Sequence, residues 1–230
     1  KRISKIKEAG IIDISVQSNA TLMTKKKAKE LIDSGLTSMG FSIESINKKK
    51  YEEIRKDLIL EDAINGIDDF IYVRNKIAPN LPVNIFFTYN KNNKNEYKSY
   101  RKFWMKRLTK DLDKIFLLPI HSFYKFEAYT EIKNKACYQI FTDMHIRSDG
   151  TVSLCCIDVE SVFGLGNLKL DNLFSIYNSK QFKIDRHKHF TNKRSEMSIC
   201  KTCDQPEASN KLCVDNLDSI SPILEGDFFH

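Results

Sequence analysis

The chain has 230 residues and a formal net charge of +7, with 41% hydrophobic and 29% charged residues. That length can bury one good core or two modest ones, and the composition is ordinary for a soluble globular protein. The lysines are scattered or fall in short runs, such as Lys25–Lys27 and Lys48–Lys50, that are not interleaved with aromatic residues. This pattern indicates a solvated surface and argues against a nucleic-acid partner.

The first half of the chain alternates strand and helix patterns. Strands are expected at Ile11–Ala20, Leu36–Ser45, Leu81–Asn90 and Asp113–Ile120. Helical patterns lie between them: one that Thr24 caps and Gly35 ends, a long region that ends before Pro79, and one with a core-packing stripe of Tyr97, Tyr100, Trp104 and Leu108. Strands separated by helices predict a parallel sheet, with ligands at the carboxyl ends of the strands.

The alternating pattern begins abruptly. Residues 1–10 look like the end of a helix with no strand before it, and they lack the apolar core of a signal peptide. We therefore expect the chain to be the remainder of a longer protein, with an incomplete parallel (β/α) barrel over residues 1–125.

After about residue 125 the pattern changes to that of a small α+β domain, expected over residues 126–230. A β-hairpin is predicted first, and then two short helices capped by Asp171 and Ser179. All six cysteines lie in this region. No apolar run reaches the length of a membrane span, so we expect no membrane partner, a cytoplasmic location and reduced thiols.

The cysteines fall largely into two pairs. Seventeen residues separate Cys137 from Cys155, and a hairpin turning near residues 148–150 would bring these two side by side. Cys200 and Cys203 form a CxxC, whose spacing lets both sulfurs face one centre. Four thiolates suit either a tetrahedral zinc ion or a cubane iron–sulfur cluster, and the spacing leaves both open.

A plainer interpretation is that some of the cysteines are small buried hydrophobic side chains. This interpretation has most weight for Cys156, which directly follows Cys155. Adjacent side chains in a strand point to opposite faces, so only one of these two cysteines is expected to bind a metal.

Several stretches resemble radical S-adenosylmethionine (SAM) enzymes that carry a C-terminal SPASM domain or its shortened twitch form. Residues 17–45 are similar to a family strand ending in Thr-Asn-Gly, a helix, and a strand ending in Ser-x-Asp-Gly. Cys137, twelve residues, Gly150, four residues and Cys155 fit the start of the SPASM signature. Residues 165–182, LGNLKLDNLFSIYNSKQF, are similar to the stretch that usually follows.

The chain also departs from the family. The CxxxCxxC loop that holds the SAM-cleaving cluster is absent from these 230 residues, as is the Gly-Gly-Glu strand end, and the resemblance implies that both lie upstream of Lys1. A full SPASM domain uses seven cysteines for two auxiliary clusters. Here Cys200, Cys203 and Cys213 fit the third, fourth and sixth positions, Ser209 stands at the fifth, and no seventh exists.

The resemblance therefore implies one auxiliary [4Fe–4S] cluster, similar to the twitch arrangement of the 2-deoxy-scyllo-inosamine dehydrogenase type. Its implied ligands are Cys137, Cys155, Cys200 and Cys203, with Cys213 and Cys156 as alternates.

Other site residues also follow from the resemblance. Asn19 matches the Asn of Thr-Asn-Gly and Ser42 the Ser of Ser-x-Asp-Gly, which implies cofactor contacts on the SAM side of the barrel; the alternative is a local turn or strand-end role. Glu44 stands where the family has Asp. Some oxidising SPASM enzymes have a base after the second cysteine, and Asp158 is the nearest carboxylate to that place. His121, at the end of the last predicted strand, is a candidate substrate contact or a polar cap.

The resemblance implies a radical SAM oxidoreductase or a peptide- or sugar-modifying enzyme. In this family a core [4Fe–4S] cluster gives one electron to SAM, and the resulting 5′-deoxyadenosyl radical abstracts hydrogen from the substrate. An auxiliary cluster then relays electrons or serves as structure. The implied partners are a peptide or sugar (aminocyclitol) substrate and a reductant, and for this chain alone we expect cluster binding without turnover.

The alternative function is a structural zinc-binding interaction module without catalysis. In that interpretation the same four cysteines hold zinc and the α/β part docks a partner. His187 and His189 are expected on the surface of a helix.

Overall fold

The computed structural model describes residues 2–90, 93–119 and 135–203. The chain divides into two compact units; of the described residues, 2–119 belong to the first and 135–203 to the second. The expected domain boundary at residues 125 and 126, and the candidates His121 and Cys213, lie outside the described residues.

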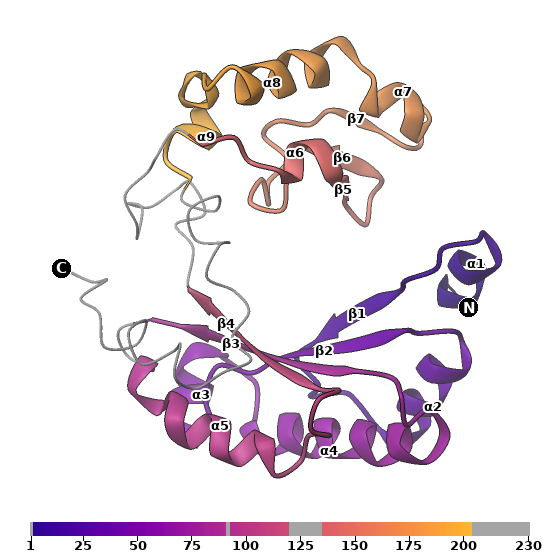
Figure 1. Cartoon of the computed structure of the whole chain (residues 1–230), viewed down its shortest axis with the longest axis vertical. Helices are drawn as coiled ribbons and strands as arrows, with labels where there is room; N and C mark the ends of the chain where they lie inside the picture. Colours follow the sequence, from indigo (N-terminus) through magenta and orange to yellow (C-terminus); the bar gives the residue numbers. More distant parts are fainter. Residues whose placement is uncertain (1, 91–92, 120–134, 204–230) are drawn as a thin grey trace. The chain divides into compact units, whose positions relative to one another are not determined.

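The first unit contains a four-stranded sheet in the order β1-β2-β3-β4, with every neighbouring pair parallel (Figure 1). The strands are β1 (Ser15–Ser18), β2 (Ser38–Ser42), β3 (Val83–Tyr89) and β4 (Lys114–Pro119). Each lies within one of the four predicted segments, so the predicted α/β organisation is confirmed for this part of the chain. Because the strands are parallel, their carboxyl ends lie at one edge of the sheet.

One helix of the first unit precedes β1, and the others lie between its strands in sequence. The helices are α1 (Arg2–Glu8), α2 (Lys25–Asp33), α3 (Lys48–Ile54), α4 (Leu60–Ile77) and α5 (Tyr97–Met105), with a short 3₁₀ turn, η1 (Lys94–Glu96). Figure 1 shows α2, α4 and α5 on the same side of the sheet. The predicted cap is confirmed, because the Thr24 hydroxyl accepts a hydrogen bond from the Lys27 backbone N–H.

The long helical region predicted before Pro79 is two helices. Between α3 and α4 the chain passes through Asp57, whose φ is +65°, in the left-handed region that interrupts a right-handed helix. An aspartate tolerates that conformation better than most residues do, but the sequence alone did not place the break.

Part of the core of the first unit lies between β3 and α5. Alternate side chains of β3 are buried, as the two-residue period of a strand requires. Phe87 lies 4.4 Å from Tyr100 between ring centroids, and Tyr97 and Trp104 are buried on the same helix face. The predicted core stripe is therefore confirmed, and burying each such large side chain contributes about 1.5–3 kcal/mol.

A buried ion pair ties α4 to β4. The Arg74 guanidinium donates two hydrogen bonds to the Asp113 carboxylate, at 3.0 and 2.6 Å, and both side chains are fully buried. Asp113 also accepts from the backbone N–H of Val83 and of Thr109. These bonds satisfy the carboxylate and hold the start of β3 beside β4, which offsets the cost of burying the charges.

The second unit has a three-stranded antiparallel sheet and short helices (Figure 1). Its strands are β5 (His145–Ile146), β6 (Thr151–Ser153) and β7 (Gly166–Asn167), in that order. Its helices are α6 (Gln139–Thr142), α7 (Leu173–Tyr177), α8 (Lys180–Phe190) and α9 (Ser198–Lys201), with a 3₁₀ turn, η2 (Arg194–Glu196).

The predicted hairpin is present as β5 and β6. Its turn ends at Gly150, whose φ of +92° favours glycine, and whose N–H donates to the Arg147 carbonyl. Cys137 does not stand at the foot of a hairpin strand, however, because α6 separates it from β5. Ser179 caps α8 as predicted, whereas α7 is capped by Asn172 and not by Asp171.

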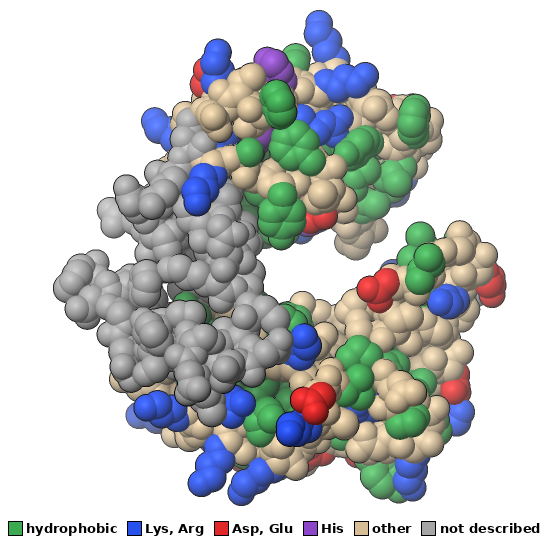
Figure 2. All heavy atoms as spheres, viewed as in Figure 1, with side chains coloured by type: hydrophobic (Ala, Val, Ile, Leu, Met, Phe, Trp, Pro, Cys, Tyr) green, Lys and Arg blue, Asp and Glu red, His purple; other side chains and the backbone are tan. Residues whose placement is uncertain are grey.

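Two surface properties bear on the predicted partners. In Figure 2 the lysine and arginine side chains of the described residues are dispersed and do not form a continuous stripe on this face. In the described part of the chain, no helix combines the length and the apolar character that crossing a membrane requires.

Candidate metal centre

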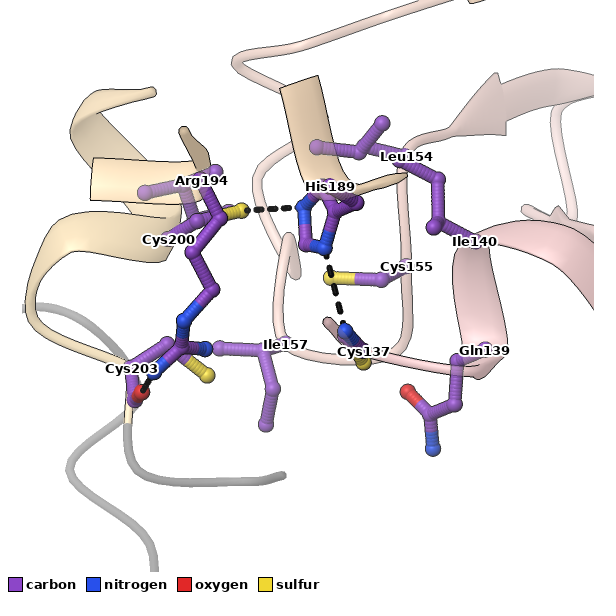
Figure 3. A pocket seen from close by; sticks show the side chains of 11 residues that line it. Cys137, Gln139, Ile140, Leu154, Cys155, Ile157, His189, Arg194, Cys200 and Cys203 are labelled. Atoms are coloured by element: carbon purple, nitrogen blue, oxygen red, sulfur yellow. Dashed lines mark hydrogen bonds between the residues drawn. The ribbon is translucent and has the colours of Figure 1, made fainter. Parts of the chain in front are cut away.

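The structure brings four of the six cysteines to one pocket of the second unit. The pocket is lined by Cys137, Cys155, Cys200 and Cys203, together with apolar side chains and a few polar ones. Figure 3 shows the four sulfur atoms around a common space. These are the four cysteines that the resemblance implies as ligands.

Three separate segments supply the four sulfurs. Cys137 comes just before α6, Cys155 follows β6, and Cys200 lies in α9 with Cys203 directly after it. The Cys203 N–H donates to the Cys200 carbonyl at 3.4 Å, so the CxxC closes in a single turn and both of its side chains reach the same pocket.

The core of the second unit fixes these segments. Cys200 belongs to a buried cluster with Ile140, Leu154, Phe182, Met197 and Ile199. Since Ile140 follows Cys137, Leu154 precedes Cys155, and Ile199 precedes Cys200, each ligand segment is anchored by an apolar neighbour. Packing of ordinary hydrophobic residues therefore sets the positions of the thiols.

Cys156 does not line this pocket. Its side chain is exposed, is not among the pocket residues, and donates its thiol hydrogen toward the Gln139 side-chain oxygen at 3.3 Å. The expectation that only one of Cys155 and Cys156 faces the site agrees with this arrangement, and the one that faces it is Cys155.

The pocket disfavours free thiolates. Burial raises the pKa of Cys155 to about 12 and raises that of Cys200 further, and burial also raises the pKa of Cys137. A thiolate in this apolar lining therefore needs a positive charge beside it, which a bound metal ion supplies as it displaces the proton. The donor set is four sulfurs, the ligand type preferred by zinc and by iron–sulfur clusters.

The sulfurs surround a space without meeting at one point. Among the residues that the structure describes, no group of three or more His, Cys, Asp or Glu side chains is arranged to hold a single metal ion. The space that no protein atom fills is about 400 Å³, with open solvent at its mouth included.

His189 lines this pocket, and the expectation that it lies on the helix surface is wrong. It is only 1% exposed; its Nδ1 accepts from the Cys137 backbone N–H at 3.1 Å, and its Nε2 lies 3.4 Å from the Cys200 sulfur. Burial and the nearby Arg194 charge lower the His189 pKa to about 4. His187, two residues earlier, is exposed as expected.

Arg194 is a second pocket residue that sequence reasoning missed. The residue is 2% exposed, and its guanidinium donates to the Cys203 carbonyl at 3.1 Å (Figure 3). A buried cation beside four thiols favours an anionic occupant, and a metal centre with four thiolate ligands carries net negative charge.

Asp158 lies close to Cys155 in sequence, but its carboxylate is bonded to the backbone. That carboxylate is fully buried and accepts from the N–H groups of Val162 at 2.8 Å and Phe163 at 3.1 Å, and more weakly from that of Leu154 at 3.5 Å. These bonds fold the chain after Cys155 into a compact turn. This placement gives Asp158 a structural role and does not direct it into the cysteine pocket.

The candidate cofactor residues of the first unit lie at one edge of its sheet. Ser42 ends β2, and Asn19 follows the last residue of β1, which pairs with Phe41. Asn19 accepts hydrogen bonds from the backbone N–H and the hydroxyl of Thr21, so it also shapes the local turn. Ser42 accepts from the Gln17 amide at 2.6 Å, a partner that the sequence pattern did not indicate.

Glu44, two residues beyond β2, is already paired. It is buried and forms an ion pair with Arg55, which reaches it from the end of α3. The pair holds α3 against the end of β2. The Glu44 carboxylate is therefore engaged within the protein in this structure.

One comparison with known proteins matches the part of the chain that contains the cysteine pocket. Residues 137–204 match the model of the SPASM family, described as an iron–sulfur cluster-binding domain. A GTP 3′,8-cyclase from Thermodesulfovibrio yellowstonii is 33% identical over 69 residues, which are 30% of this chain and 20% of that protein.

A solved structure, described as hexahistidine-tagged anSMEcpe with bound AdoMet, is similar in fold. Its TM-score is 0.56 at 14% sequence identity, over 82% of this chain and 61% of that one. The chain thus spans less than two thirds of either relative. Together the comparisons show that residues 137–204, which contain the four pocket cysteines, are similar to an iron–sulfur cluster-binding domain, and that the fold of the chain is similar to that of the AdoMet-bound protein.

Proposed function

We propose that this chain is part of a radical SAM enzyme and that its second unit holds one auxiliary [4Fe–4S] cluster through Cys137, Cys155, Cys200 and Cys203. One observation carries the proposal: three separate segments place these four cysteines around one pocket, within the region that matches the SPASM model. Four sulfurs from protein leave no open iron, which favours electron relay or a structural role over binding of substrate at the cluster.

The arrangement of the sulfurs supports a cluster over zinc. A single zinc ion requires all four sulfurs about 2.3 Å from one centre. In a cubane cluster each thiolate binds a different iron, so the sulfurs stand around a space, as they do here (Figure 3). The structural zinc module is the alternative, and metal analysis decides between the two.

A bound [4Fe–4S] cluster would supply one-electron redox chemistry. The chain's own residues would set its surroundings. Ile157 and Ile199 line the pocket with apolar surface that limits water, and the Arg194 guanidinium would balance negative charge. The CxxC turn and the Asp158 turn would hold the ligand segments in place.

In the first unit we propose Asn19 and Ser42 as cofactor-side residues. Both lie at the carboxyl edge of a parallel sheet, where ligands of such folds bind. The core cluster that cleaves SAM would be held outside these 230 residues, since their cysteine spacings include no CxxxCxxC.

The activity of the whole enzyme is proposed at the level of its class. It is hydrogen abstraction by a SAM-derived radical, on a peptide or a sugar-like (aminocyclitol) substrate, with a reductant as electron donor, in the cytoplasm. Asp158 and His121 remain candidate catalytic residues. The hydrogen bonds from backbone N–H groups to the Asp158 carboxylate favour a structural role for Asp158.

Metal analysis of the chain, purified and reconstituted without oxygen, tests the auxiliary cluster. We expect about four iron and four sulfide per chain with a reducible cluster signal, and much less in Cys200→Ser or Cys203→Ser. About one zinc per chain without sulfide would overturn the cluster in favour of the zinc module. Cys156→Ser is the matched control, because that cysteine is exposed and does not line the pocket.

A further inference from the structure

We propose that His189 is a positioning residue that raises the reduction potential of the auxiliary cluster by donating an N–H···S hydrogen bond to the Cys200 sulfur. This inference rests on the proposed function, because it requires a cluster at the four cysteines. It assigns a role to a residue that is neither a ligand nor part of any motif in the sequence.

The contacts of the ring fix which nitrogen carries the proton. The backbone N–H of Cys137 points at Nδ1 over 3.1 Å, and a backbone N–H can only donate. Nδ1 must therefore accept, which leaves the single proton of the neutral ring on Nε2. Nε2 lies 3.4 Å from the Cys200 sulfur, so its N–H is directed at that sulfur (Figure 3).

The position of His189 makes this contact well defined. The residue lies in α8, and its ring reaches the Cys137 segment on one side and α9 on the other. At 1% exposure, water does not compete for either nitrogen, and a hydrogen bond in such surroundings is electrostatically stronger than in water. The ring thus links two ligand segments that are 63 residues apart in sequence.

The direction of the effect follows from charge. A hydrogen bond to a ligand sulfur withdraws electron density from it, and reduction adds one negative charge to the cluster and its thiolates. The bond therefore stabilises the reduced state more than the oxidised state, and hydrogen bonds to the sulfurs are one of the factors that set cluster potentials. Removing the bond should lower the potential.

Three variants separate this role from simple packing. His189→Leu removes both the acceptor and the donor, and His189→Phe keeps a ring without either. His189→Gln keeps a carbonyl oxygen that can accept from Cys137 and an N–H that can donate to Cys200. The matched control is His187→Leu, on the same helix and exposed.

The test is a redox titration of the reconstituted chain, followed by electron paramagnetic resonance, with iron and sulfide measured in each sample. We expect a lower midpoint potential for His189→Leu and His189→Phe, partial or full recovery for His189→Gln, and no change for His187→Leu. Equal potentials in loaded wild type, Leu and Phe variants would overturn the inference. Wild type without iron and sulfide would instead overturn the proposed function.

A second measurement covers the case in which the apolar variants fail to load. In wild-type chain labelled with ¹⁵N-histidine, the reduced cluster should show an exchangeable proton and a ¹⁵N coupling by electron–nuclear double resonance. The same signals should persist in His187→Leu. A loaded wild-type cluster that shows neither signal would contradict the hydrogen bond without the use of any His189 variant.

Discussion

Cys155 and Cys156 are neighbours in the chain, yet the first lines the cysteine pocket, whereas the second is exposed, does not line it and bonds to the Gln139 side chain. The chain leaves β6 at Ser153 and enters the turn that Asp158 organises, so consecutive side chains there point in different directions. A difference of one position therefore decides which thiol lines the pocket.

This geometry predicts unequal effects of two adjacent substitutions. Cys155→Ser should lose most of the iron bound by the reconstituted chain, because a hydroxyl is a poor iron ligand, whereas Cys156→Ser should retain it. Iron and sulfide per chain are the measurement, with the visible absorbance of the cluster as a second readout. A chain that is emptied by Cys156→Ser and still loaded after Cys155→Ser would reverse the ligand assignment.

The buried Asp158 carboxylate leads to a prediction about stability. Asp158→Asn should destabilise the second unit by about 1–3 kcal/mol. The carboxylate now accepts hydrogen bonds from backbone N–H groups, and the amide NH₂ of asparagine would place a second donor against one of them. Loss of cluster absorbance against urea in the reconstituted chain measures the change. Asp171→Asn is the control: that side chain is exposed and accepts a hydrogen bond from the Asn172 backbone N–H, which an amide oxygen can also do. Equal midpoints for the two variants would argue against a structural role.

Gly66 provides a test of how α4 holds the loop that carries the candidate cofactor residue Asn19. A Cβ at this position of α4 would stand 2.2 Å from the Ala20 carbonyl oxygen, next to Asn19 in the chain. Alanine normally favours a helix interior over glycine by about 0.5–1 kcal/mol. Gly66→Ala should nevertheless destabilise the first unit by about 1–3 kcal/mol, because helix and loop must separate.

The only tryptophan in the chain, Trp104, is buried in the first unit and reports its unfolding by fluorescence. Asn65→Ala on the exposed side of α4 is the control and should raise stability slightly. A gain in stability for Gly66→Ala would show that α4 does not pack on the Ala20 carbonyl as closely as the structure has it.

Much of the first unit could be predicted because strand and helix patterns alternate regularly along its sequence. Thr24 shows this directly, since the residue expected to cap α2 does so. The break at Asp57 could not be predicted, because it depends on a single backbone conformation inside an otherwise continuous helical pattern. Boundaries of this kind are set by tertiary packing, which overrides local propensity.

The four cysteines that line the pocket could be selected from spacing and resemblance, but their surroundings could not. His189 lies in the sequence DRHKH, where every residue is polar, so no apolar stripe indicates which side of α8 is buried. The buried face, made by Phe182, Asp185 and His189, is set by the cysteine pocket and the core beneath it. Arg194 was missed for the same reason, because buried cations next to a metal centre have no local signature.

The last prediction concerns pH. Tyr100 is fully buried, and its hydroxyl donates to the Ile43 carbonyl at 2.8 Å. Burial, with a smaller contribution from the Glu44 charge, raises the Tyr100 pKa well above its usual value near 10. Above about pH 10 the unfolded chain releases the tyrosine proton, whereas the folded chain keeps it. The free energy of unfolding must therefore fall as pH rises.

We therefore expect the first unit to keep its full Tyr100 contribution below about pH 10 and to lose it progressively above. Tyr100→Phe should cost about 1 kcal/mol at neutral pH through the lost hydrogen bond, and should make the alkaline decline shallower. Tyr51, Tyr89 and Tyr97 also have raised pKa values through burial, so part of the decline should remain. Urea unfolding followed by Trp104 fluorescence between about pH 8 and about pH 11 measures how the free energy of unfolding changes with pH in wild type and in Tyr100→Phe. Equal slopes for the two proteins would mean that Tyr100 is hydrated in the folded state.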